Sequence, residues 1–229
     1  GALDAPDTEN DNLAIGYDAL GGSIAGGEYN VAIGNYSLDA NTSGDFNIAV
    51  GYNSMGDNTT GSYNTVIGDY SLDANTTGVG NTADGYSSLG ANTTGSANTA
   101  IGYNSLLVNT TSHNNTAIGY ASLLSNTTGT DNTAIGKNAL QFVSTGANNT
   151  GIGKEAGKSL TTGSNNIIIG EEAVASAVDA TNQIVIGREA AGHGDNIAVI
   201  GNTDMTALHP ADDNGVDLGS SSYSYKNAH

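Results

Sequence analysis

The chain has 229 residues and a formal net charge of −18, and aromatic residues make up only 6% of it. No lysine or arginine precedes Lys137, so the basic surface needed for binding nucleic acid or anionic lipid is missing from more than half of the sequence. No apolar run approaches the length of a membrane-spanning helix, and there is no cysteine whose disulfides could report the compartment.

Residues 1–11 are acidic and irregular, and we interpret them as a segment that caps the following repeats. No signal peptide opens the chain, and its first residues resemble an internal cut or a processed terminus.

A repeat of 17 residues fills residues 12–202 and reads N-T-A-I-G-Y-N-S-L-x-x-N-T-T-G-x-x. The asparagines that open the units stand 17 residues apart, at Asn30, Asn47, Asn64, Asn81, Asn98, Asn115, Asn132, Asn149 and Asn166. A short and constant period indicates identical turns, each of which contacts only its neighbours. The sequence therefore predicts an all-β chain, a β-solenoid of the parallel β-roll type.

Each unit contains two apolar arms. In Asn-Thr-Ala-Ile-Gly, strand alternation places Thr and Ile on one face and Ala and Gly on the other. Ser-Leu is expected to form a second short strand, so that two strands complete each flattened turn. Asn-Thr-Thr-Gly forms the corner, where glycine is expected to take the positive φ of a tight turn. These corner glycines are Gly44, Gly61, Gly78, Gly95, Gly129, Gly146 and Gly163.

Every regular turn supplies one isoleucine and one leucine. A coil closed by alanine and glycine is too thin to hold both rows, so we expect one row inside and the other against a partner chain. Which row faces the partner stays open. Stacked asparagines are expected to satisfy their amides along the rod. The candidate core or oligomer residues are Ile101, Ile118, Ile135, Leu106, Leu123 and Leu140.

Patterns that could carry chemistry are weak. The run 151–159 lacks the glycine that a phosphate-binding loop needs at Ile152, and it falls in repeat register. The four histidines are scattered, without metal-ligand spacing. Asp39 and Asp73 share one slot two turns apart; Ca²⁺ binding is an alternative to solvated carboxylates there. With no catalytic constellation, neither enzyme activity nor a cofactor is expected.

Threonines and tyrosines form further rows. The Asn-Thr-Thr corners align two threonine rows that resemble ice-binding faces, although turn capping is the simpler interpretation. Exposed tyrosines can stack on sugar rings, so Tyr86, Tyr103 and Tyr120 are the candidate ligand-binding residues; a structural ladder or oligomer contact is the alternative. The tyrosines share one slot at Tyr17, Tyr52, Tyr86, Tyr103 and Tyr120, and stand one residue later at Tyr36 and Tyr70.

Two resemblances extend this interpretation. Asn-Thr-Ala-Ile-Gly-Tyr-x-Ser-Leu, over residues 12–202, resembles the N-x-A-x-G repeat of YadA-like head domains in trimeric autotransporter adhesins, although the unit here is longer. That family's heads are left-handed parallel β-rolls that assemble as trimers and bind host surface molecules. Residues 203–229 lack the repeat and are interpreted as a cap or a connector to a further domain. Within them, residues 215–227 resemble the segment that follows the repeats of many bacteriophage tail fibres.

The resemblances imply a homotrimer that serves as the structural and adhesive shaft of an extracellular or virion (phage tail) fibre. Such a shaft would contact glycans or proteins on the host surface, without binding nucleic acid or inserting into a membrane. The alternative is an ice-binding or other surface-binding solenoid that uses its threonine ladders.

Overall fold

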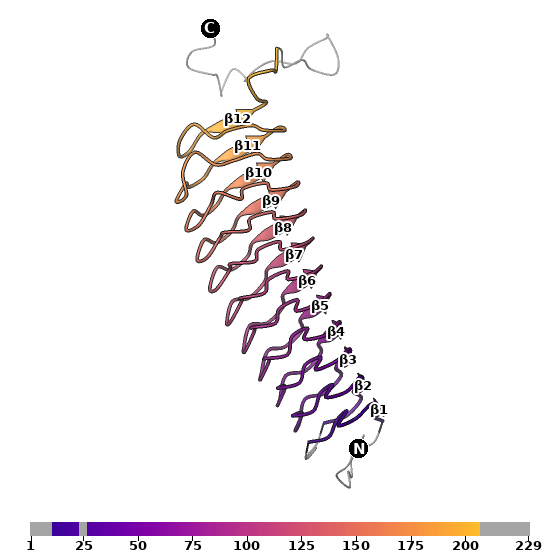
Figure 1. Ribbon diagram of the computed structural model, residues 1–229. Helices are drawn as coiled ribbons and strands as arrows, with labels where there is room; N and C mark the ends of the chain where they lie inside the picture. Colours follow the sequence, from indigo (N-terminus) through magenta and orange to yellow (C-terminus); the bar gives the residue numbers. More distant parts are fainter. Residues whose placement is uncertain (1–10, 23–26, 207–229) are drawn as a thin grey trace, which may run out of the picture.

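The computed structural model describes residues 11–22 and 27–206. They form a gently curved rod of stacked turns, with β1 at one end and β12 at the other (Figure 1). Each turn contributes one strand of three residues to a single parallel sheet of 12 strands, ordered as in the sequence. The expected all-β parallel β-solenoid is confirmed. The strands are β1 (Leu13–Ile15), β2 (Val31–Ile33), β3 (Ile48–Val50), β4 (Thr65–Ile67), β5 (Thr82–Asp84), β6 (Thr99–Ile101), β7 (Thr116–Ile118), β8 (Thr133–Ile135), β9 (Thr150–Ile152), β10 (Ile167–Ile169), β11 (Ile184–Ile186) and β12 (Ala198–Ile200).

Strand alternation decides which side chains enter the rod. β6 pairs with β7 in register, so that Ala100 lies beside Ala117 and Ile101 beside Ile118. Both alanines are fully buried, whereas 37% of Ile101 is exposed. The central residue of each strand therefore faces the interior, and the first and third face outward, as side chains of a pleated strand must.

The Ser-Leu arm is not a strand, which corrects the expectation of two strands per turn. Leu106 has a φ of 49° and is fully buried. Its backbone N–H donates to Ser122 O of the next turn at 3.0 Å, and its carbonyl accepts from Asn109 N within the turn at 3.2 Å. Left-handed backbone is unfavourable for leucine. The stack compensates for this cost by burying the side chain and satisfying the backbone.

The corner glycines are needed because neighbouring atoms leave no room for a Cβ, and not because the backbone has a positive φ. This corrects a second expectation. Gly61 lies outside the left-handed region, but a Cβ built there would be 2.5 Å from both Asn58 Oδ1 and Gly78 O. Positive φ occurs instead just before each opening asparagine, as at Tyr63 with a φ of 60°. It also occurs after each strand, as at Gly102, where φ is 126° and a Cβ would lie 2.7 Å from Gly119 O.

Two buried asparagine ladders run through the rod, as expected. Asn98 Nδ2 donates to Asn81 Oδ1 at 3.2 Å and to Ser112 O at 2.9 Å, while the Asn98 backbone N–H donates to the same Asn81 oxygen at 3.0 Å. In the second ladder, Asn75 Nδ2 donates to Asn58 Oδ1 at 2.8 Å. Buried amides are costly unless they are hydrogen-bonded, so these ladders fix the register of successive turns.

The interior changes in the later turns while staying filled. Gly157 stands where Leu140 stands one turn earlier, and Ile168 replaces the inward alanine of β10. A Cβ at Gly157 would lie 2.6 Å from Leu140 Cδ2 and 3.2 Å from Ile168 Cδ1, so the two larger side chains occupy the space that the glycine leaves. Interior volume is thus conserved between turns, as close packing requires.

Parts of the expected organisation lie outside the described residues. These are residues 1–10 of the expected N-terminal cap, residues 207–229 of the expected C-terminal cap or connector, and with them the 215–227 segment. In the described part of the chain, no helix is long and apolar enough to cross a bilayer.

Candidate functional site

The outward residues at the third position of the strands form a row that we call the isoleucine column. Its exposed members include Ile15 at 56%, Ile67 at 45% and Ile135 at 37%. One residue breaks the column: Asp84 of β5 lies between Ile67 and Ile101 in the sheet register. The column consists of Ile15, Ile33, Val50, Ile67, Asp84, Ile101, Ile118, Ile135, Ile152, Ile169, Ile186 and Ile200.

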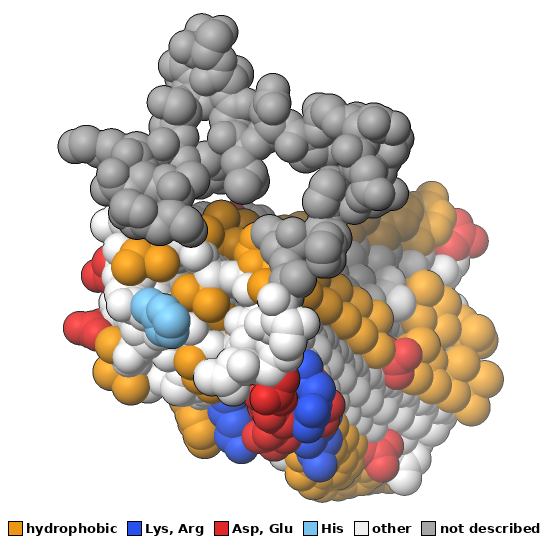
Figure 2. All heavy atoms as spheres, turned by 90° about the horizontal axis from the view of Figure 1, so that it is seen from above, with side chains coloured by type: hydrophobic (Ala, Val, Ile, Leu, Met, Phe, Trp, Pro, Cys, Tyr) orange, Lys and Arg blue, Asp and Glu red, His pale blue; other side chains and the backbone are white. Residues whose placement is uncertain are grey.

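The structure separates the two apolar rows of the sequence. Leu106, Leu123 and Leu140 are fully buried in the rod, and Ile101 and Ile135 are each 37% exposed. Figure 2, which looks along the rod, shows hydrophobic side chains on its outside in rows that follow its length. The leucines therefore hold the turn together, and the isoleucines are available to a partner.

Seven tyrosines form one continuous ladder, although they occupy two sequence slots. Neighbouring ring centroids lie between 5.3 Å and 6.0 Å apart. Where Asn35 and Asp69 occupy the usual tyrosine slot, their Oδ1 atoms accept hydrogen bonds from Tyr17 N and Tyr52 N of the preceding turn. The tyrosine ladder consists of Tyr17, Tyr36, Tyr52, Tyr70, Tyr86, Tyr103 and Tyr120.

The three predicted ligand-binding tyrosines lie together at one end of this ladder. Tyr86 and Tyr103 are nearly parallel with centroids 5.3 Å apart, and Tyr103 and Tyr120 are nearly parallel at 5.4 Å. Parallel rings at these distances stack with a lateral offset, so each covers part of its neighbour's face. Lys137 Nζ lies 5.8 Å from the Tyr120 centroid in a cation–π contact. The ring faces are therefore partly covered within the stack, and the ring edges and hydroxyls are the most accessible groups for a ligand.

The earlier part of the ladder is built differently. Tyr70 is turned by 70° from Tyr86 at a centroid distance of 6.0 Å. Tyr70 is likewise turned by 64° from Tyr52 at a centroid distance of 5.3 Å, so its ring lies outside the parallel stack of Tyr86, Tyr103 and Tyr120. Partial burial, followed by the proximity of Tyr52 and a hydrogen bond to it, raises the pKa of the Tyr70 hydroxyl.

A second aromatic ladder was overlooked in the sequence. Tyr29 and Phe46 stack at 4.9 Å, and Phe46 and Tyr63 stack at 5.1 Å. All three residues are exposed and have positive φ. Their 17-residue spacing is visible in the sequence and could have revealed them.

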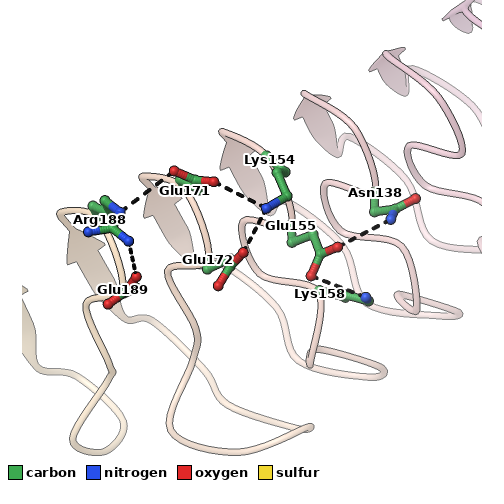
Figure 3. Close-up of polar contacts among 8 residues, drawn as sticks. All are labelled: Asn138, Lys154, Glu155, Lys158, Glu171, Glu172, Arg188 and Glu189. Carbon is green, nitrogen blue, oxygen red and sulfur yellow. Dashed lines mark hydrogen bonds and ion pairs between the residues drawn. The ribbon is translucent and has the colours of Figure 1, made fainter.

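After Tyr120 the same edge of the rod carries ion pairs (Figure 3). Lys154 Nζ lies 2.7 Å from Glu172 Oε1 and 3.1 Å from Glu171 Oε1, and Arg188 pairs with Glu171 and Glu189. The bonds to Glu172 and then Glu171 raise the pKa of Lys154. These side chains are exposed, so each pair adds little stability, but the edge changes from aromatic and acidic to mixed charge.

The threonine rows divide by role. In the first row hydroxyls donate to the next turn, as Thr59 Oγ1 does to Thr76 O at 2.9 Å. The second row, which includes Thr60 and Thr77, is exposed. His113 lies in repeat register: its Nδ1 accepts a hydrogen bond from Ser96 N, 17 residues earlier, at 2.9 Å.

Aspartate and glycine alternate beside the tyrosine ladder. The slot that follows each interior leucine or methionine holds Gly21, Asp39, Gly56, Asp73, Gly90 and then Leu107. Burial raises the pKa of Asp73, and burial followed by the charges of Asp18 and Asp57 raises that of Asp39. Because glycine separates the acids, no two carboxylates of this slot lie in adjacent turns. No group of three or more metal-ligating side chains gathers anywhere in residues 11–22 and 27–206.

The absent side chain of Gly90 leaves an open hollow of about 460 Å³. A Cβ at Gly90 would lie 3.4 Å from Asp73 Oδ1 and 3.2 Å from Leu107 Cδ1, so the carboxylate and the leucine border this empty slot. The hollow is lined by Tyr70, Asp73, Tyr86, Ser87, Gly90, Ala91 and Leu107.

Comparison of the chain with models of protein families, with curated proteins and with solved structures finds no match. The fold itself defines the class: a parallel β-solenoid with one apolar column and two aromatic ladders on its surface. The resemblance to adhesin heads and tail fibres stays a prediction.

Proposed function

We propose that this chain is the structural and adhesive shaft of an extracellular or virion fibre, assembled as a homotrimer through its isoleucine column. The proposal rests on one observation above all: outward apolar residues follow the sheet from β1 to β12. Soluble monomers rarely expose continuous apolar surface on this scale, whereas association surfaces do.

Charge and architecture support the same proposal. The net charge of −18 keeps a long rod soluble and opposes unspecific side-to-side contact. Repeated weak contacts along a rod, multiplied by several chains, give avidity without a deep pocket. Tyr86, Tyr103 and Tyr120 are the proposed lateral contacts to host glycans or proteins, through their hydroxyls and ring edges.

The alternative of an ice-binding solenoid is supported by a smaller exposed threonine surface. The hydroxyls of the first threonine row donate to backbone carbonyls of the next turn, as at Thr42 and Thr76. One exposed row at the corner remains. Measurement of thermal hysteresis tests this alternative directly.

The assembly part is tested by native mass spectrometry of the full chain. We expect a trimer, and we expect Ile101→Asp, Ile118→Asp and Ile135→Asp together to give folded monomers, because stacked charges would be buried between chains. The matched control places three aspartates on the exposed corner of neighbouring turns, at Thr94, Thr111 and Thr128, and should stay trimeric. A monomeric wild-type chain would falsify the proposal.

A further inference from the structure

We infer that the hollow at Gly90 binds a pyranose unit that carries no anionic group. Its lining combines an aromatic ring turned out of the stack, a carboxylate and an apolar side chain around a position without a side chain. The inference deepens the adhesive part of the proposed function and rests on it. It also adds Tyr70 and Asp73 to the sugar contact, beside Tyr86 at the end of the parallel stack.

The aromatic contribution comes from Tyr70. Tyr70 is 38% exposed, and its ring is turned by 70° from Tyr86, so it lies outside the parallel stack and lines the hollow. The C–H bonds on one side of a pyranose form an apolar surface that packs against an aromatic face, and the tyrosine hydroxyl can bond to the sugar's rim. Leu107 supplies an apolar wall on the opposite border of the slot.

The polar contribution comes from Asp73. Its carboxylate borders the slot that Gly90 leaves empty, with Oδ1 3.4 Å from where a Cβ would stand. An ionised carboxylate accepts hydrogen bonds from two neighbouring hydroxyls, and such charge-assisted bonds are the stronger kind. Ser87 adds a hydroxyl to the same lining. A few polar groups in an otherwise apolar recess are typical of small-ligand sites.

The surrounding charge selects the class of sugar. Asp57, Asp69 and Asp73 lie on the same and neighbouring turns, and no lysine or arginine precedes Lys137 in the chain. A uronate or sialate carboxylate would meet like charge without a cation to pair with. A neutral sugar avoids this repulsion and still offers hydroxyl donors to Asp73.

The test measures binding of cellohexaose, a neutral oligosaccharide, and of hexagalacturonate, an anionic oligosaccharide with the same number of pyranose units, to the full chain by calorimetry. Wild type should bind the neutral probe and reject the anionic one. Gly90→Leu should weaken cellohexaose binding by about tenfold or more, because the leucine fills the recess that the sugar would occupy. Asp73→Asn should weaken it less and should reduce the discrimination between the probes.

Gly90→Leu is suited to this test because leucine occupies the same slot at Leu107 and Leu124. The backbone of Gly90 is not left-handed, and a new Cβ would lie 3.2 Å from the movable end of Leu107 and 3.3 Å from Ser87 O, so only small shifts are needed. Leu124→Ala, in the same slot but outside the hollow, is the matched control and should bind like wild type.

Three outcomes overturn the inference: no binding of cellohexaose, equal binding of both probes, or unchanged binding by Gly90→Leu. Native mass measured on the same samples separates this inference from the proposed function. A trimer that ignores cellohexaose removes the sugar site and leaves the fibre shaft. A monomeric wild type removes the shaft, whatever it binds.

Discussion

Leu106 and Ile101 stand five residues apart in one turn, yet the leucine is fully buried and 37% of the isoleucine is exposed. The inside of the rod keeps a narrow composition, and where Gly157 replaces a leucine, neighbouring side chains fill its place. The outside tolerates changes in charge: the isoleucine column contains Asp84, and Lys137 follows the last residue of the tyrosine ladder. The interior fixes the fold, and the exterior is available for contacts with other molecules.

The largest expected effect comes from moving residues between inside and outside. Deleting residues 98–114 removes one whole turn and should leave a folded rod shortened by about 4.8 Å. Deleting residues 98–105 alone would bring corner residues onto strands and expose interior side chains, so we expect loss of cooperative unfolding. Circular dichroism during urea titration distinguishes the two deletion variants. Equal tolerance of both deletions would contradict a rod whose turns are locked in register.

A smaller effect is expected from shortening a single side chain, either inside the rod or on its surface. Leucine and isoleucine have the same number of atoms, so the two truncations can be compared directly. Leu106→Ala should lower the free energy of unfolding by about 2–5 kcal/mol, because it leaves a cavity in a closed interior. Ile101→Ala should lower it by less than about 1 kcal/mol in the monomer, where solvent already reaches the side chain. Urea unfolding at concentrations that keep the chain monomeric gives both values. Similar losses would mean that the isoleucine column also supports the fold of the single chain.

Changes confined to the tyrosine ladder should affect binding and leave stability nearly constant. Because the stack partly covers the faces of Tyr86, Tyr103 and Tyr120, we expect their hydroxyls to be the main groups that contact a ligand. Changing all three to phenylalanine should therefore weaken attachment to host cells by about tenfold, much as changing all three to serine should. A cell-binding assay compares the two triple variants with wild type. If only the serine variant loses binding, ring contacts carry it; if neither does, these tyrosines are not adhesive.

The smallest expected effect concerns Asp73. Burial raises its pKa above the ordinary value of an aspartate, so folding favours the protonated carboxyl. That contribution to stability is present below the unfolded pKa and is lost as pH rises through the folded pKa. Asp73→Asn should therefore unfold like wild type near pH ~3 and be more stable at neutral pH, by less than about 1 kcal/mol because solvent screens a half-buried group. Urea unfolding at both pH values measures the change in stability caused by Asp73→Asn. A variant less stable than wild type at neutral pH would contradict the prediction.

The repeat allowed much of the architecture to be predicted. A constant spacing places Asn81 next to Asn98 and Ala100 next to Ala117 in any stacked arrangement, so the parallel solenoid and its asparagine ladders follow from the period. The assignment of isoleucine to the outside could not be reached in this way, since strand alternation defines two faces without saying which is enclosed.

Other features depended on contacts that no single unit reveals. Leucine has no local preference for a φ near 49°, so the backbone of Leu106 reflects hydrogen bonds to neighbouring turns. The repeat predicts a positive φ at Gly61, but glycine is required there because Gly78 of the next turn lies too close for a Cβ. Tyr36 and Tyr70 were placed in a separate slot, yet their rings complete the ladder because side chains reach across one residue of offset.

The hydrogen bonds between turns also give the rod a mechanical character. Strands lie across the rod, so the bonds that join one turn to the next point along it. Tension applied through the ends of the chain would load the outermost turn's bonds first and open the rod turn by turn. Each freed turn of 17 residues would extend to about 56–61 Å. We expect such a shaft to lengthen in steps under load, absorbing mechanical work while the turns still stacked remain intact.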